Sequence, residues 1–208
     1  MTKEHPIILS TPMVKAILDG RKTQTRRPIK PQPKDTWSEF MPVITTGWST
    51  DLWNFYNPNS FDDCGDIKCP YGQVGDRLWV RETFCYKVDP NTEEVCHNEY
   101  WYRATDPDIV KIDTENQCET SPWKPSIHMP RWASRIDLEI TEIRAERLQD
   151  ITPSDAVAEG ALPYNLHGWL KEVSDFNFQL LWDSINGKKY PWDSNCWVWV
   201  ISFKKEEG

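Results

Sequence analysis

Two segments in the second half of the chain have the apolar pattern of β-strands. In the first, Ile136, Leu138 and Ile140 alternate with charged residues. The apolar phase then shifts by one position at Ile143, which is typical of a bulged or bent strand, as found in barrels. The second segment, CWVWVISF at residues 196–203, is apolar on both faces, so we expect it in the middle of a sheet.

The first thirty residues predict a strand, a short helix and a return to extended chain. The apolar run PIIL, residues 6–9, is expected to be the first strand. Thr11 is expected to cap the helix, with Pro12 at its first position and Gly20 ending it in a left-handed conformation. The apolar stripe of this helix consists of Val14, Ile17 and Leu18.

Three further elements are expected later in the chain. A turn at residues 75–76 precedes a strand in GDRLWVRETF. In ITPSDAVAEGALP, Thr152 is the expected N-cap, Asp155 completes a capping box and Gly160 ends a short helix. A longer helix is predicted for residues 169–185.

Residues 31–73 and 87–121 have no sustained apolar period and are rich in turn-forming residues. We interpret both segments as irregular insertions, with one strand at EYWYRA in the second. Strands then dominate, and no alternation of strands and helices suggests a doubly wound sheet. The chain is predicted to be a single α+β domain, mainly β, over residues 1–208: a small mixed or antiparallel barrel with flanking helices.

The formal net charge is −8, but its distribution is uneven. Residues 1–30 carry seven Lys or Arg against two acidic residues, whereas residues 51–120 carry six against fifteen. The acidic middle argues against a protein that wraps a long phosphate backbone, and it leaves room for a small positive site. No apolar run could span a bilayer and the first residues lack a signal core, so we expect a cytoplasmic protein with no membrane partner.

The six cysteines are interpreted as free thiols in a reducing compartment, without disulfides. The alternative is a zinc site in an insertion, formed by Cys64, Cys69, Cys96, His97 and Cys118. The spacing of these residues matches no established zinc pattern, so we expect no bound metal.

Lys22, Thr25 and Glu159 are the candidates for chemistry. Lys22 lies among other cations, whose repulsion lowers the pKa of a lysine and lets it accept a proton. The alternative is ordinary solvated charge behind a helix C-terminus. Thr25 can share a site with Lys22 only if the chain turns, because an ideal strand places them on opposite faces. Glu159 ends a helix, where a carboxylate is disfavoured, so it is either a general acid or base or a tolerated surface residue.

Twelve tryptophans are unusual for this length. Those in periodic segments are expected in the core: Trp79, Trp182, Trp197 and Trp199. Those in or beside irregular segments either bury loops or form an aromatic wall able to stack bases: Trp37, Trp48, Trp53, Trp101, Trp123 and Trp132. His128, in PSIHMPRWASRI, is either structural or a ligand contact.

GRKTQTRR fits the signature G-x-K-x-x-[ET]-x-R of the ASCH domain, a PUA-like family, with Gly20, Lys22, Thr25 and Arg27 in register. The chain resembles the longer, tryptophan-rich ASCH proteins of phages and prophages through several further segments. These are GDRLWVRETF, SPWKPSIHMPRWASRI, LQDITPSDAVAEG, LLWDSING and CWVWVISF. The resemblance implies a small PUA-like β-barrel in which the lysine and the helix carrying the acid face one cleft.

The resemblance also implies a function. A compact bacterial branch hydrolyses the acetyl amide of N4-acetylcytidine with a Lys, Thr and Glu triad, which corresponds here to Lys22, Thr25 and Glu159. No cofactor or metal is required. The residues expected to bind substrate are Arg26, Arg27, Trp79, Glu82, His128 and Trp132. The alternatives are a non-catalytic module for a modified base or short single-stranded RNA, and a phage accessory protein that binds a host protein through its acidic middle.

Overall fold

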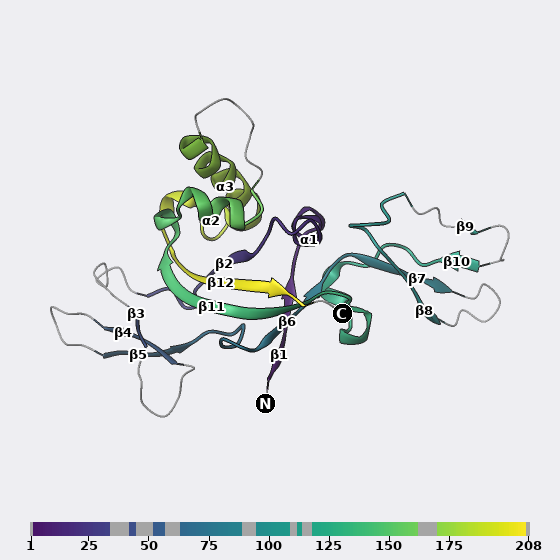
Figure 1. Cartoon of the computed structure of the whole chain (residues 1–208), viewed down its shortest axis with the longest axis horizontal. Coiled ribbons are helices and arrows are strands. Elements are labelled where there is room, and N and C mark those ends of the chain that lie inside the picture. The colour runs from purple at the N-terminus through teal and green to yellow at the C-terminus, as the bar shows by residue number, and fades with distance from the viewer. Residues whose placement is uncertain are drawn as a thin grey trace.

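The computed structural model describes residues 2–33, 42–44, 52–56, 63–88, 95–108, 112–113, 118–161 and 170–206. Strands make up most of its regular structure, with few helices. The central sheet has the order β1-β6-β11-β12-β2, in which β1 and β6 are parallel and the other neighbours antiparallel (Figure 1). Its strands are β1 (Glu4–Ile8), β2 (Gln24–Pro28), β6 (Arg77–Arg81), β11 (Asp137–Arg147) and β12 (Trp197–Lys205).

Strand β12 lies in the middle of this sheet, as its apolar faces predicted. One face contributes Trp199 and Ile201 to a core cluster shared with β1, β6, β11 and the helix after β1. The other face contributes Val198 and Val200 to a second cluster. Burial on both faces explains why the first five residues of the strand are all apolar.

The predicted phase shift in β11 is a β-bulge, because the register with β12 changes between Ile140 and Glu142. Figure 1 shows β11 and β12 curving together around the middle of the molecule. The pairings among the described strands give an open order with β1 and β2 at its edges. These pairings do not close into the ring of a barrel.

Helix α1 (Thr11–Leu18) connects the two edge strands β1 and β2. Its N-cap is Ser10, not Thr11, because the first helical hydrogen bond runs from the amide of Val14 to the carbonyl of Ser10. Pro12 lies in the first turn, where its missing N–H costs nothing. Gly20 has a φ of 72° and ends the helical segment as predicted.

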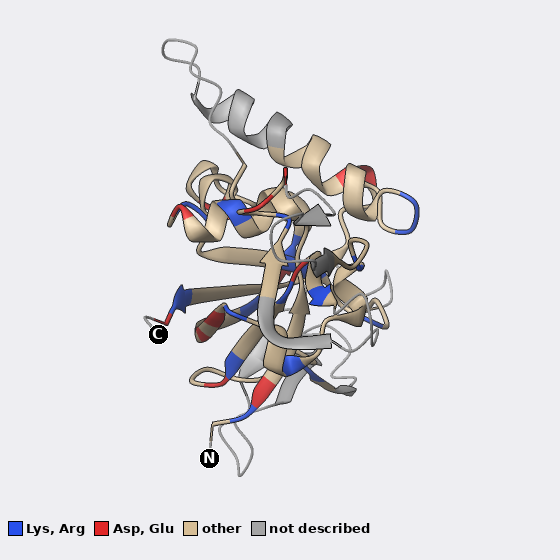
Figure 2. Ribbon diagram, turned by 90° about the vertical axis from the view of Figure 1, so that its right-hand side faces the viewer, with Lys and Arg blue, Asp and Glu red and all other residues tan. Residues whose placement is uncertain are grey.

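Helices α2 (Pro153–Ala158) and α3 (Leu170–Asn186) lie together over one face of the central sheet, as Figures 1 and 2 show. Thr152 caps α2 and forms the predicted capping box with Asp155. From α3, Phe178 and Trp182 pack onto the outer face of β12 in the second core cluster. No helix among the described residues is long and apolar enough to cross a bilayer.

The two predicted insertions are not irregular, since each contains a small antiparallel sheet. The first sheet consists of β3 (Pro42–Ile44), β4 (Leu52–Tyr56) and β5 (Asp63–Lys68). The second consists of β7 (Phe84–Val88), β8 (Val95–Tyr102), β9 (Ile112–Asp113) and β10 (Cys118–Thr120). Figure 1 shows them on opposite sides of the central sheet. The strand predicted at EYWYRA is confirmed as the end of β8, whereas the other strands of these sheets have only two to six residues, and pairing with neighbours decides their structure.

Candidate functional site

A cavity of about 540 Å³ lies among the start of α1, strand β2, the end of α2 and the last turns of α3. We call it the lysine cavity. Its charged and hydroxyl-bearing lining includes Lys22, Thr25, Arg26, Arg27 and Glu159. Its apolar wall includes Met13, Phe178, Leu181, Trp182 and Ile185. A volume of this order suits a small organic ligand.

The turn after α1 brings Lys22 into this cavity. With Gly20 in the left-handed region, the amides of Arg21 and Lys22 both donate to the carbonyl of Ala16, each at 2.9 Å. The next residue, Thr23, donates its amide to the carbonyl of Ala158 at the end of α2. Lys22 therefore lies before β2 and against α2, outside the strand. An ideal strand would place Lys22 and Thr25 on opposite faces, but here both can line one cavity.

Lys22 is buried, with only 3% of the residue exposed. Its Nζ donates to the backbone carbonyls of Gln24 and Glu159, each at 2.7 Å, and to Oε2 of Glu159 at 3.1 Å. These three acceptors match the three N–H donors of an ammonium group. Burial lowers the pKa of Lys22, and the Glu159 carboxylate acts in the opposite direction.

Glu159 is the C-cap residue of α2 and is 4% exposed. Its Oε2 accepts from Lys22, and its Oε1 lies 3.2 Å from Nη1 of Arg26. Two cations therefore compensate a carboxylate in a position where the helix dipole disfavours it. Glu159 is therefore a buried residue that joins α2 to Lys22 and to β2, although the end of a helix disfavours a carboxylate.

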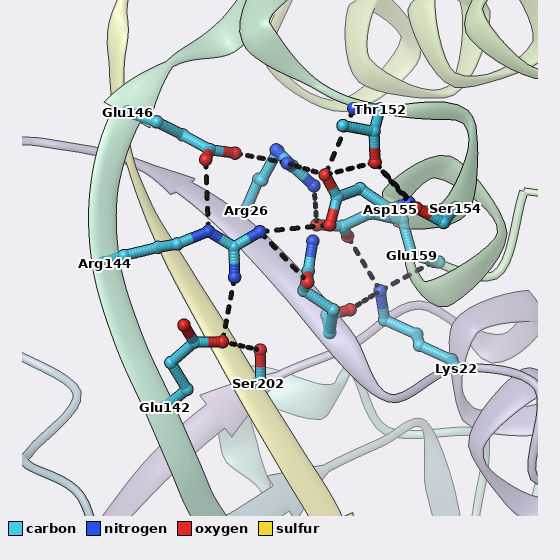
Figure 3. Close-up of polar contacts among 11 residues, drawn as sticks. Lys22, Arg26, Glu142, Arg144, Glu146, Thr152, Ser154, Asp155, Glu159 and Ser202 are labelled. Carbon is cyan, nitrogen blue, oxygen red and sulfur yellow. Dashed lines mark hydrogen bonds and ion pairs between the residues drawn. The ribbon is translucent and has the colours of Figure 1, made fainter.

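Arg26 is the centre of a larger charged network behind the cavity (Figure 3). Its guanidinium is fully buried and pairs with Glu146, Asp155 and Glu159. Arg144 bridges the same acids, at 3.1 Å from Glu146 and 3.0 Å from Asp155. Burial alone would raise the pKa of Asp155, but hydrogen bonds from Thr152 and the charge of Arg26 lower it to about 2.

Gly160 allows α2 to end this close to Lys22. Its φ is 84°, and a Cβ added there would lie 3.1 Å from the Cβ of Ala16 and 3.3 Å from the Cβ of Lys22. Both the left-handed backbone and the close approach therefore require glycine. Only the left-handed backbone was predicted from the sequence.

Thr25 and Arg27 complete the polar lining. Thr25 is 4% exposed and lines the cavity, and its side chain makes no hydrogen bond to a described residue. Arg27 donates from Nη2 to the carbonyl of Ile8 at 2.7 Å, which links the two edge strands of the central sheet. The Thr25 hydroxyl is consequently available to a ligand in the cavity.

Trp79 and Glu82, predicted to bind substrate, do not line the lysine cavity. Glu82 is buried in a two-point ion pair with Arg135, at 3.0 and 3.2 Å. Trp79 is half-buried, with the guanidinium groups of Arg81 and Arg131 over its ring, and the prediction that it fills the core is wrong. The reason is the alternation of β6, since Leu78 and Val80 occupy the core face.

His128 and Trp132, also predicted to bind substrate, line a second cavity of about 710 Å³, which we call the aromatic cavity. Its other lining residues are Phe84, Tyr86, Pro122, Trp123, Lys124, Pro125 and Pro130. The two predicted residues are therefore together, but they are not with Lys22. The short 3-10 turns at residues 126–128 and 131–133 keep them on the side of the second insertion.

Several residues of the site were not predicted from the sequence. Asp155 was expected only as a cap, and Arg144 and Glu146 look like the exposed face of an alternating strand. The apolar wall from α3 was visible only as a helical period. No local signal distinguishes these residues, because their roles depend on contacts between distant segments.

The cysteine predictions divide between described and undescribed residues. Cys69, Cys85 and Cys196 are buried free thiols. The side chains of Cys64, Cys96, His97 and Cys118 lie outside the described residues, as do those of Trp37, Trp48 and Trp53. Within the part of the chain that the structure describes, no group of His, Cys, Asp and Glu could hold a metal ion.

The site combines a buried amine, a buried carboxylate and an available hydroxyl on one cavity. Such groups can exchange protons with a bound ligand and with each other. No family model, curated protein or solved structure matches this chain. The functional argument therefore depends on the geometry of the lysine cavity and on the sequence signature around Lys22.

Proposed function

We propose that the protein hydrolyses the acyl amide on the exocyclic amine of an N4-acylated cytidine, with Lys22, Thr25 and Glu159 as its catalytic residues. The observation that carries the proposal is the buried pair of Lys22 and Glu159, 3.1 Å apart, on the wall of a cavity that Thr25 also lines. The resemblance of GRKTQTRR to the ASCH signature supports the same three residues.

The buried pair supplies an acid and a base without a change in net charge. Moving one proton from the Lys22 ammonium to the Glu159 carboxylate leaves a neutral amine beside a carboxylic acid. The remaining N–H groups of Lys22 keep their hydrogen bonds to the two backbone carbonyls. Burial lowers the pKa of Lys22 and so favours its neutral amine.

Acylation then follows with balanced protons. Neutral Lys22 takes the proton of the Thr25 hydroxyl as the oxygen attacks the acyl carbonyl carbon. Glu159 gives its proton to the leaving exocyclic amine, which releases cytidine and leaves an acyl ester on Thr25. The pair has returned to ammonium and carboxylate. Glu159 then accepts a proton from the attacking water, and Lys22 returns one to the Thr25 oxygen as the carboxylic acid leaves.

A variant of this route uses Thr25 only to orient a water that attacks the amide directly. Among the described residues no hydrogen bond joins Lys22 to Thr25 in the resting structure, which is compatible with either route. Trapping an acyl ester on Thr25 after rapid quenching, followed by mass spectrometry, distinguishes the two. Arg27 on the cavity lining is the residue that would stabilise negative charge on the tetrahedral intermediate.

The proposal is tested by incubating the protein with N4-acetylcytidine and measuring the release of cytidine by chromatography. We expect turnover by the wild type and a loss of roughly 100-fold or more in Lys22→Met and in Glu159→Gln. Arg21→Met is the matched control, because Arg21 neighbours Lys22 but pairs with Asp19 at the surface. Absence of wild-type turnover, or equal rates in all four proteins, would reject the hydrolase.

A second candidate function is a binding module for a modified cytidine without catalysis. It is favoured by the resting state of Lys22, whose three donors are all taken by protein acceptors, as in a purely structural ammonium. A binder retains affinity for N4-acetylcytidine in Glu159→Gln and releases no cytidine in any form. A catalyst retains that affinity in the variant but loses turnover that the wild type possesses.

A further inference from the structure

The aromatic cavity and the lysine cavity share a wall. Thr83 lines the lysine cavity, and the next residue, Phe84, lines the aromatic cavity. In the same way, Ser126 lines the lysine cavity and its neighbour Pro125 lines the aromatic cavity. Consecutive Cα atoms are about 3.8 Å apart, so the linings of the two cavities meet at these two places.

The lining of the aromatic cavity suits flat rings. It contains four aromatic side chains and three prolines, and no Asp or Glu is among its described lining residues. Trp132 is 63% exposed, and its ring lies 5.3 Å from that of Tyr100. The two rings are tilted by 54° against each other. An exposed tryptophan is a platform on which a further ring can stack.

Two cations lie over other rings of this cavity lining. Lys124 lies over the ring of Tyr86 at 5.1 Å, and Arg103 lies over the ring of Trp123 at 5.4 Å. Neither forms an ion pair with an acidic residue in the described part of the chain. His128 also lines the cavity. Positive charge beside aromatic rings is the chemistry that binds the phosphates and bases of a single strand.

We propose that the aromatic cavity stacks the base adjacent to the one held in the lysine cavity, so that the substrate is a cytidine within single-stranded RNA and not the free nucleoside. This inference rests on the proposed function, which makes the substrate a ribonucleoside. The two adjoining cavities accommodate neighbouring nucleotides, and the net charge of −8 limits the contact to a short segment. A duplex is unsuitable because its bases already stack on each other.

The direct test measures the binding of fluorescein-labelled tetracytidylate by fluorescence anisotropy at one fixed salt concentration. Trp132→Ala is expected to weaken binding by about 5- to 150-fold, which corresponds to the loss of one stacked base. Trp132→Phe retains a ring and should recover most of the affinity. Ile127→Ala is the matched control, since Ile127 is an exposed apolar residue of the adjacent turn that lines neither cavity.

Two further arms identify the ligand. Lys124→Gln should reduce the dependence of log affinity on log salt by about 0.7 if Lys124 contacts one phosphate. Free cytidine should bind wild type and Trp132→Ala equally, because a single nucleoside occupies only the lysine cavity. Tetradeoxycytidylate should bind more weakly than the ribonucleotide probe, and equal affinity for the two would overturn the assignment to RNA.

The inference and the proposed function fail in different ways. Equal tetracytidylate binding by wild type and Trp132→Ala, or affinity no higher than that for cytidine, overturns the second subsite even if N4-acetylcytidine is hydrolysed. Conversely, stacking on Trp132 that persists in Glu159→Gln, together with no release of cytidine by the wild type, retains the subsite and removes the hydrolase.

Discussion

The lysine cavity and the aromatic cavity adjoin each other but differ in the burial and pairing of their charged side chains. In the lysine cavity, Lys22 and Arg26 are buried and paired with carboxylates. Beside the aromatic cavity, Arg103 and Lys124 rest on aromatic rings near the surface. A buried charge that loses its partner costs several kcal/mol, whereas an exposed cation beside a ring costs little to leave unpaired.

The side chains of the lysine cavity are held rigidly by each other, whereas those of the aromatic cavity are available to a ligand. In the lysine cavity, each charged group holds the next in position, and proton transfer requires such fixed geometry. In the aromatic cavity, rings and cations remain open to a ligand of matching shape and charge. Substitutions of the paired charges in the lysine cavity should consequently lower the free energy of unfolding far more than substitutions in the aromatic cavity do.

The largest effect is expected from Arg26→Met, which leaves three carboxylates near each other without their buried cation. The free energy of unfolding should fall by about 3 to 5 kcal/mol. Urea unfolding followed by tryptophan fluorescence measures the loss. Arg21→Met, which breaks only the surface pair with Asp19, should lose at most about 1 kcal/mol. Similar losses in both variants would contradict the role of Arg26.

A smaller loss is expected from Gly160→Ala. The new methyl group would meet Ala16 and Lys22 and would force a left-handed backbone, for a total of about 2 to 3 kcal/mol. Gly20→Ala is the matched comparison, since Gly20 also has a positive φ but has open space around its Cβ position. It should lose about 1 kcal/mol. Thermal or urea unfolding of the two variants separates crowding at Lys22 from backbone strain.

Asp155 should make the lysine cavity sensitive to acid. Its pKa is lowered from 3.8 to about 2, so its contribution is present at pH values above 3.8 and is lost as the pH falls toward 2. After allowance for solvent screening, the contribution is about 1 to 2 kcal/mol. Urea unfolding at neutral pH and at successively lower pH values measures it. In Asp155→Asn this part of the pH dependence should disappear, and an unchanged profile would contradict the assignment.

The smallest effect on stability is expected from Trp132→Ala in the aromatic cavity. Because most of the Trp132 side chain is exposed, its removal should change the free energy of unfolding by no more than about 0.5 kcal/mol. The same urea unfolding assay measures this change. A loss above 2 kcal/mol would mean that Trp132 is a structural residue, and the contrast between the two cavities would then fail.

Local signals predicted the elements that carry the site. The alternation and phase shift of residues 136–143 became β11 with its bulge, and CWVWVISF became an interior strand of the same sheet. Thr152 and Asp155 formed the expected capping box, and Gly20 took the expected positive φ. These features depend on neighbours within a few residues, which is why a single sequence contains them.

Other features depended on pairing between segments. Of the strands in the two small sheets, only the one at EYWYRA was predicted, and it forms the end of β8; the others have two to six residues and show no sustained period. The burial of Trp182, Trp197 and Trp199 was predicted correctly, but Trp79 was assigned to the wrong face of its strand. A tryptophan can occupy either face of a strand, and the packing of the sheet decides which face is buried.

The strands of the large sheet, the helix ends and the chemical character of GRKTQTRRPIK could be predicted from local patterns, because hydrophobic period, capping and glycine conformation act over short distances. The packing of the folded chain, by contrast, brings Lys22 to Glu159 across 137 positions and gathers three acids around Arg26. It also decided that Trp132 faces a separate cavity. The physical reason is that the pairing of buried charges and the sharing of a cavity wall depend on which distant surfaces pack together, and no local pattern encodes that choice.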